Sequence, residues 1–184
     1  MKIIGDKKSF AFEIGDCLSH NPTFRAVDIW AGGRRLCLDD TSVYAGQFVA
    51  SLKRETSKIY EIRLFEETLK GKTPEEMAHF VCSTREEESP NHGLHDDSIF
   101  PAYNFLNLGP TTDNIRAFLF RQNTGAHLVY SLWREDQKRS LPMRFHVVAL
   151  DFDFVMSVLH RSIDILENEK AEPSASASSS SPRA

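Results

Sequence analysis

The sequence predicts an α+β domain, in which an antiparallel β-sheet of about five to six strands packs against three or four helices on one side. Short runs of aromatic and β-branched residues, bounded by turn residues, indicate the strands, because such side chains suit a half-buried pleated surface. Near the C-terminus, apolar residues recur at helical spacing and indicate a long helix that follows a strand. We expect the apolar face of the sheet and the apolar stripe of that helix to bury each other.

The N-terminal part is predicted to be an antiparallel meander of three strands. Residues 3–14 suit one strand that a polar turn at 5–9 interrupts, and residues 24–30 alternate as a second strand. Gly32-Gly33 indicates a two-residue hairpin turn into a third strand at 34–38, because glycine adopts positive φ at little cost. A first helix is then expected from Asp39-Asp40-Thr41-Ser42 to about Arg54.

The middle of the chain carries a clear helix-start signal, Thr73-Pro74-Glu75-Glu76. Thr73 can cap a helix, Pro74 suits the first helical position, and Glu76 completes a capping box. A short helix is therefore predicted from this point to about Ser83.

Two less regular segments flank that helix. Residues 62–69 favour a helix that Gly71 stops, although alternating apolar residues at 60–64 would also suit a strand. Residues 85–114 show no periodicity, and a connection of this length in a compact domain is either functional or loose. The apolar residues of its second half indicate that this half packs on the core.

The C-terminal third predicts a strand pair, a further strand and a helix. Strands are expected at 115–121 and 127–134, joined by a turn at 122–125 in which Gly125 permits positive φ. A strand at 144–150 and a helix from about Phe152 to Glu167 follow. We predict a single domain over residues 1–171 and a disordered tail over 172–184, because the tail consists mainly of Ser, Ala and Pro.

Charge and hydropathy argue against several classes of protein. The 184 residues include 22 Lys and Arg against 26 Asp and Glu, a net charge of −4. A mildly acidic chain is a poor binder of nucleic acid or of an anionic membrane by default. No stretch approaches the ~18 apolar residues of a membrane helix, and the first residues lack the apolar run of a secretion signal. The expectation is a cytoplasmic protein.

Three widely spaced cysteines, Cys17, Cys37 and Cys82, predict neither a disulfide framework nor a zinc knuckle. Cys37 and Cys82 have apolar neighbours and are expected in the core as reduced thiols. Three histidines could be considered as a base for a thiol nucleophile: His20, His79 and His146. Nothing local supports such a pair, because a reactive thiol needs an accessible, electropositive setting.

The segment His92-Gly93-Leu94-His95-Asp96-Asp97 is the nearest approach to a metal site. Its two imidazoles and two carboxylates could supply ligands to a divalent ion. The plainer interpretation is a polar surface loop, because metal sites usually draw their ligands from separated elements and no matching distant cluster stands out. No metal and no cofactor are therefore predicted.

Acidic positions recur from residue 39 to residue 97 and could form a negative patch that holds a basic protein. They are Asp39, Asp40, Glu66, Glu67, Glu75, Glu76, Glu86, Glu87, Glu88, Asp96 and Asp97. The plainer interpretation is ordinary surface carboxylates, some of which favour the first turns of helices. Trp30 and Trp133 are expected in the core rather than at an interface, although Trp is enriched at binding hot spots.

Several different short motifs are spread along almost the whole chain. They are Ile3-Ile4-Gly5-Asp6, Phe10-Ala11-Phe12-Glu13, Ile29-Trp30-Ala31-Gly32-Gly33, Asp39-Asp40-Thr41, Phe105-Leu106-Asn107-Leu108-Gly109-Pro110, and Leu132-Trp133-Arg134 before the closing strand and helix. Together they resemble the bacterial immunity protein 42 family of polymorphic toxin and contact-dependent growth inhibition systems. The resemblance covers about residues 1 to 168, whereas the Ser-rich tail and the length of the Arg85–Ile99 insert depart from the pattern.

The resemblance implies a non-enzymatic protein that binds a cognate toxin domain, often a nuclease, and blocks its active site or substrate groove. It transfers no catalytic residues and does not locate the interface. The charge pattern supplies our predicted contact residues, because a basic toxin cleft would attract carboxylates. These residues are Glu86, Glu87, Glu88, Asp96 and Asp97.

Two other functions stay open at this point. One is a small metal-dependent hydrolase that uses His92, His95 and Asp96, and it requires metal bound to the purified protein. The other is a ligand-binding regulatory domain, which predicts an apolar pocket between sheet and helix instead of a filled core.

Overall fold

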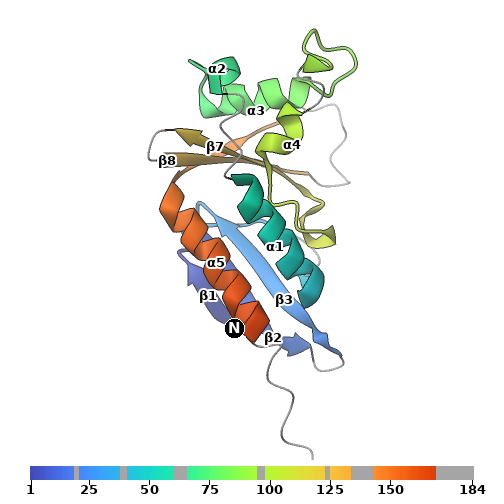
Figure 1. Cartoon of the computed structure of the whole chain (residues 1–184), viewed down its shortest axis with the longest axis vertical. Coiled ribbons are helices and arrows are strands. Elements are labelled where there is room, and N and C mark those ends of the chain that lie inside the picture. Colours follow the sequence, from blue (N-terminus) through green and yellow to red (C-terminus); the bar gives the residue numbers. More distant parts are fainter. Residues whose placement is uncertain are drawn as a thin grey trace, which may run out of the picture.

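A computed structural model of the chain describes residues 1–18, 21–37, 41–59, 66–94, 98–122, 125–133 and 143–168. Within these ranges the chain forms two antiparallel sheets, of five and four strands, and five α-helices. The predicted α+β class is confirmed. The strands divide between two sheets, whereas the sequence indicated one, and the two sheets follow one another along the long axis of the molecule (Figure 1).

The first sheet is built from the N-terminal quarter of the chain. Its strands are β1 (Lys2–Gly5), β2 (Phe10–Leu18), β3 (Asn21–Ala31), β4 (Arg34–Arg35) and β5 (Ser42–Tyr44). The order is β1-β2-β3-β4, and β5 also pairs with β3.

Two predictions for this region are wrong in detail. Residues 5–9 do not interrupt one strand but turn between two paired strands, since Ile4 lies opposite Phe12 and the Asp6 amide donates to the Phe10 carbonyl at 3.1 Å. Ser42–Tyr44 does not begin a helix but pairs with β3, with Tyr44 opposite Phe24. The first pairing is a local hairpin, whereas in the second, pairing with a separate strand outweighs the local helix signal.

The predicted turn at Gly32-Gly33 is confirmed between β3 and β4. Both glycines have positive φ, 57° and 77°, which a side chain would strain. Their amides also donate to the carbonyls of Ser9 and Lys7, both at 2.9 Å, so this turn is bonded to the turn between β1 and β2.

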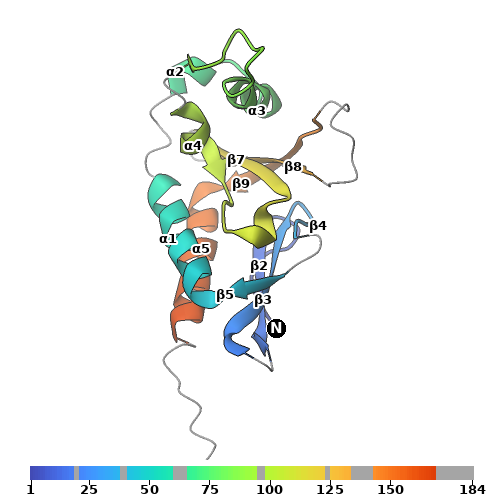
Figure 2. The same ribbon diagram turned by 90° about the vertical axis from the view of Figure 1, so that its right-hand side faces the viewer.

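Helices α1 (Ala45–Ile59) and α5 (Phe152–Asn168) lie side by side across one face of the first sheet (Figures 1 and 2). The apolar stripe predicted for α5 is buried and includes Val155, Leu159 and Leu166. From the sheet, Phe12 meets Phe48 of α1 edge to face, with ring centroids 6.1 Å apart. The helix stripe is buried on a sheet face as predicted, but the face belongs mainly to the first sheet and not to the strands that directly precede α5, as the sequence had indicated.

The second sheet contains β6 (Asn104–Phe105), β7 (Ile115–Gln122), β8 (Gly125–Leu132) and β9 (His146–Asp151), in that order. The predicted hairpin is confirmed, and its pairing continues to Gln122 opposite Gly125, so the connection is shorter than four residues. The predicted third strand and the helix after it are also confirmed as β9 and α5.

Three helices lie beyond the second sheet, on the side away from the first (Figure 1). They are α2 (Glu66–Leu69), α3 (Pro74–Ser83) and α4 (Ile99–Tyr103), followed by a short 3-10 turn at Pro110–Thr112. Phe100 of α4 packs edge to face on Phe118 of β7, at 5.4 Å between centroids. The sequence did not indicate α4, because five residues are too few to show a helical period.

The two sheets share one apolar core. Phe10 of β2 and Phe105 of β6 have ring centroids 6.1 Å apart, and the Tyr130 hydroxyl donates to the Ala31 carbonyl at 3.3 Å. A Cβ on Gly32 would lie 2.8 Å from a methyl of Val148, so β9 approaches the glycine turn closely. The second sheet therefore lies between the end of the first sheet on one side and helices α3 and α4 on the other (Figures 1 and 2).

The capping box predicted for α3 is confirmed. The Thr73 hydroxyl accepts from the Glu76 amide at 3.3 Å, and the Glu76 carboxylate accepts from the Thr73 amide at 2.7 Å. These contacts satisfy two amides that a helix start leaves without intrahelical partners. The predicted tail at 172–184 and the start of the preceding helix at 62–65 lie outside the described residues.

Replacing Thr73 with Ala should lower the free energy of unfolding by about 1 kcal/mol, because α3 loses its side-chain cap. Urea denaturation followed by circular dichroism measures the change. Thr73→Ser is the matched control, since its hydroxyl can still accept from the Glu76 amide. Equal stability of the Ala and Ser variants would show that the cap does not contribute.

Candidate functional site

The predicted metal segment is only partly covered by the structure. His92 is exposed in a turn, whereas His95, Asp96 and Asp97 lie outside the described residues. In the ranges that are described, no three side chains of His, Cys, Asp or Glu lie close enough together to hold a metal ion. The hydrolase alternative therefore gains no support from the part of the site that is visible.

The cysteines are free, and two of them are core residues as predicted. Cys37 is 1% exposed and Cys82 is 6% exposed. Burial raises the pKa of the Cys37 thiol to about 11, and burial also raises the pKa of Cys82. Both thiols are thereby held in the protonated form, which is a poor nucleophile. Cys17 is exposed on β2.

Negative charge is concentrated in one part of the chain. Residues 60–97 carry ten Asp and Glu against four Lys and Arg, a net charge of −6, whereas the remaining residues carry 16 against 18. The described part of this segment, residues 66–94, holds α2, α3 and the turns that follow, at one end of the molecule (Figure 1). We call this region the acidic end.

Three of the predicted contact residues, Glu86, Glu87 and Glu88, are exposed in the acidic end, and Glu75 is exposed nearby on α3. The other two, Asp96 and Asp97, lie outside the described residues, as do Asp39 and Asp40. The structure thus brings several of the acidic positions to one end but leaves the full patch undefined.

Two cations of the acidic end contact aromatic rings, one on α4 and one on α3. The Arg85 guanidinium lies 4.0 Å from the centroid of Phe100, and the Lys72 ammonium lies 5.4 Å from that of Phe80. Lys70 pairs with Glu67 at 3.3 Å, but both side chains are more than 70% exposed, so this pair contributes little. The negative field of the acidic end is therefore only partly compensated.

The core prediction for the two tryptophans is wrong for Trp133, which is 48% exposed beside the end of β8. Trp30 is only partly buried, because it lies on the face of the first sheet that the helices do not cover. Its indole N–H donates to the Glu13 carboxylate at 3.0 Å, and the Lys7 ammonium lies 4.2 Å from its ring centroid. Both residues are available to a partner.

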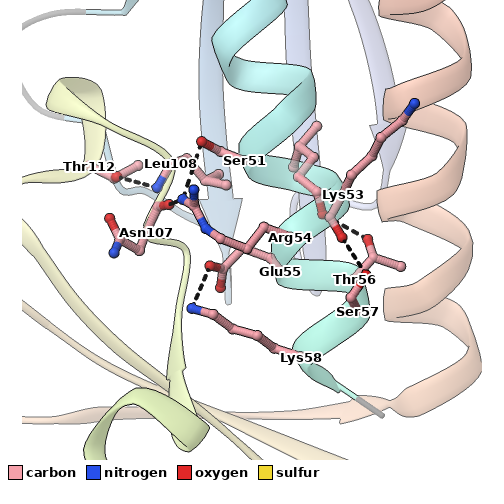
Figure 3. Close-up of polar contacts among 11 residues, drawn as sticks. Ser51, Lys53, Arg54, Glu55, Thr56, Ser57, Lys58, Asn107, Leu108 and Thr112 are labelled. Atoms are coloured by element: carbon pink, nitrogen blue, oxygen red, sulfur yellow. Dashed lines mark hydrogen bonds and ion pairs between the residues drawn. The ribbon is translucent and has the colours of Figure 1, made fainter. Parts of the chain in front are cut away.

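A buried carboxyl that the sequence did not indicate lies where α1 meets the segment after β6. Glu55 is 1% exposed, and one of its oxygens has no hydrogen-bond partner. Lys58 donates to the other oxygen at 3.1 Å (Figure 3), and the backbone of Leu106 donates a further hydrogen bond to the carboxyl. Burial nevertheless raises the pKa of Glu55 above its ordinary value, because desolvation outweighs these contacts.

The same end of α1 holds the chain at Leu106 and Asn107. Leu106 has a φ of 64°, and among the described residues it is the one non-glycine residue with positive φ. Arg54 donates to the Asn107 carbonyl at 3.0 Å and to the Ser51 hydroxyl at 3.3 Å (Figure 3). A strained backbone persists only where its surroundings over-determine it, and Arg54 and Glu55 supply that restraint.

The comparison with solved structures gives one informative match. The structure is similar to the crystal structure of CdiI from Burkholderia dolosa AUO158, with a TM-score of 0.61 and 18% sequence identity. The alignment covers 91% of this chain and 99% of that one. The two chains share a fold. No protein-family model and no curated protein matches the sequence, so the resemblance to the immunity protein 42 family stays a prediction.

Among the described residues, none of the helices is long and apolar enough to cross a membrane.

Replacing Glu55 with Gln should make the protein more stable than the wild type, increasingly so as the pH rises. The pKa of Glu55 is raised in the folded state. The stability that the protonated carboxyl contributes to the wild type is therefore fully present below the unfolded pKa of about 4.5, and it is lost as the pH rises through the folded pKa. Urea midpoints, measured at a series of pH values from mildly acidic to neutral, give the difference in stability between the variant and the wild type.

Glu167→Gln is the matched control for that series. Glu167 is 45% exposed and pairs with Lys53 across the surface, so its replacement should leave the pH dependence almost unchanged. A Glu55→Gln variant that is less stable by the same amount at every pH would contradict the raised pKa.

Proposed function

We propose that this protein is an immunity protein, which binds a cognate bacterial toxin domain and neutralises it by occluding its active site. The observation that carries the proposal is the likeness to CdiI over nearly the full length of both chains. The sequence motifs quoted above support it independently, since they resemble a family of immunity proteins. Membership of the immunity protein 42 family, a nuclease as the toxin and a cytoplasmic location are part of the proposal.

The chemistry of the described residues is consistent with binding rather than catalysis. The two buried thiols are held protonated, and the buried Glu55 carboxyl interacts with Lys58 and with backbone inside the fold. The surface carries charged and exposed aromatic side chains that can contact a partner. An inhibitor needs such a surface and no reactive centre.

We assign toxin contact to the acidic end. A nuclease cleft is basic because it binds phosphates, so exposed carboxylates would compete with the nucleic acid for it. Glu86, Glu87 and Glu88 follow α3 in consecutive, exposed positions, and none of them forms an ion pair with another described residue. Asp96 and Asp97 complete the proposed contact set.

The direct test starts from the gene next to the gene for this protein, which the proposal expects to encode a large toxin. Production of the C-terminal domain of that toxin should arrest growth of a bacterial host, and co-production of this protein should restore growth. An unrelated toxin domain serves as the control and should not be neutralised. Continued arrest, with both proteins produced and folded, would contradict the proposal.

Reversing the charges at Glu86, Glu87 and Glu88 to Lys should weaken binding to that toxin domain by roughly tenfold or more, mainly through slower association. Further reversal at Asp96 and Asp97 should weaken it again. Surface plasmon resonance at two salt concentrations measures both rates, and the variants should lose the salt dependence that the wild type shows.

The control reverses three exposed carboxylates elsewhere, Asp16, Asp113 and Asp164. This variant changes the net charge by the same amount but leaves the acidic end intact, so its association rate should fall much less. Equal losses in both triple variants would mean that overall charge, and not the acidic end, governs association.

A further inference from the structure

The first sheet has one face that no helix of the described chain covers (Figure 2). Helices α1 and α5 occupy the other face, where Phe12, Ile14 and Val27 are buried. Cross-strand partners point to the same side of a sheet, so the pairs Glu13–Asp28, Trp30–Arg35 and Phe24–Tyr44 all belong to the open face. We call this surface the outer face.

The outer face is less polar than a water-facing sheet surface usually is. Ile3 is 53% exposed on β1 and Tyr44 is 49% exposed on β5, at opposite edges of the sheet. Phe24 and Trp30 are partly exposed between these edges. Phe24 and Trp30 lie six residues apart on one strand, so the aromatic surface extends over about 20 Å.

These side chains are already held in place in the free protein. Trp30 is fixed by its bond to Glu13 and by Lys7, which donates to the same Glu13 oxygen at 2.6 Å. The Phe24 and Tyr44 rings contact each other, with centroids 5.9 Å apart. Binding of a partner would therefore immobilise few mobile side chains, which lowers the entropic cost of association.

Charges on the outer face cancel in pairs. Lys7 pairs with Glu13, and Arg35 pairs with Asp28 at 2.7 Å. A surface that carries both signs and no net charge can match itself about a two-fold axis, because each cation can approach a carboxylate of the other copy. The acidic end carries one dominant sign and would repel a second copy of itself.

We propose that the outer face of the first sheet joins two copies of this chain. Each copy presents the same mixed-charge, aromatic surface, and the two sheets pack face to face with α1 and α5 on the outside of the pair. Sheets that pack in this way lie about 10 Å apart and bury facing side chains between them. Trp30, Tyr44 and Arg35 belong to the residue types that most often anchor such contacts.

The charge pattern favours a second copy over a basic toxin as the occupant. A basic cleft would find no net negative charge on the outer face, since its two carboxylates already have cationic partners. The acidic end lies beyond the second sheet, at the far end of the molecule (Figure 1). Both acidic ends would thus stay accessible in the pair, which keeps this inference independent of the proposed function.

Sedimentation velocity of the purified full chain, across the micromolar range and without toxin, tests the proposal. The wild type should form a concentration-dependent dimer. Replacing Ile3 and Tyr44 with Arg places cations against their own copies at exposed positions, and it should weaken dimerisation by about 100-fold or more. Thermal unfolding confirms that the double variant is folded, and Tyr44→Arg alone serves if it is not.

The matched control replaces two other exposed apolar residues, Leu94 and Val147, which are 40% and 45% exposed and lie outside the first sheet. This variant should dimerise like the wild type. A wild type that stays monomeric throughout overturns the inference, as does a dimer that only the control variant disrupts. Neither outcome bears on toxin binding, which the growth test measures separately.

Discussion

The structure depends on the burial of one face of the first sheet under α1 and α5. These helices come from distant parts of the sequence, and each supplies an apolar stripe that the sheet alone could not bury. The Lys53 ammonium of α1 and the Glu167 carboxylate of α5 lie 2.7 Å apart, but this exposed ion pair adds little to the stability that the apolar contact provides. Because the helices leave the opposite face uncovered, the same packing that stabilises the fold also creates the outer face.

The junction between the two sheets contains conformations and groups that are unfavourable on their own. It places Phe10 against Phe105, turns the chain through positive φ at Leu106 and buries the carboxyl of Glu55. Glu55 bonds the chain near this turn while Arg54 bonds the next carbonyl, so α1 both covers the first sheet and fixes the path into the second. A buried acid is tolerated there because it restrains a strained segment.

Apolar burial and surface charge lie in different parts of the molecule. The apolar core is shared by both sheets, whereas residues 60–97 carry a net charge of −6 and the outer face carries the ion pairs Lys7–Glu13 and Arg35–Asp28. Such a division suits an inhibitor, because a contact surface can change while the core stays the same.

The sequence by itself determined the elements whose signals are local. The capping box at Thr73 and Glu76, the glycine turn at Gly32-Gly33, the hairpin and the closing strand and helix all depend on residues within a few positions of one another. The buried places of Cys37 and Cys82 followed from their apolar neighbours. The acidic positions were also visible, although their gathering at one end of the molecule was not.

Only the tertiary structure decided which segments pair and which faces are covered. Ser42–Tyr44 has the composition of a helix start, but it forms a strand because it pairs with the edge of β3. The division into two sheets, the burial of Glu55 and the exposure of Trp133 depend on contacts between residues that are far apart in the chain. Local patterns do not encode those contacts, because they report the period of a segment and not the partner that will cover it.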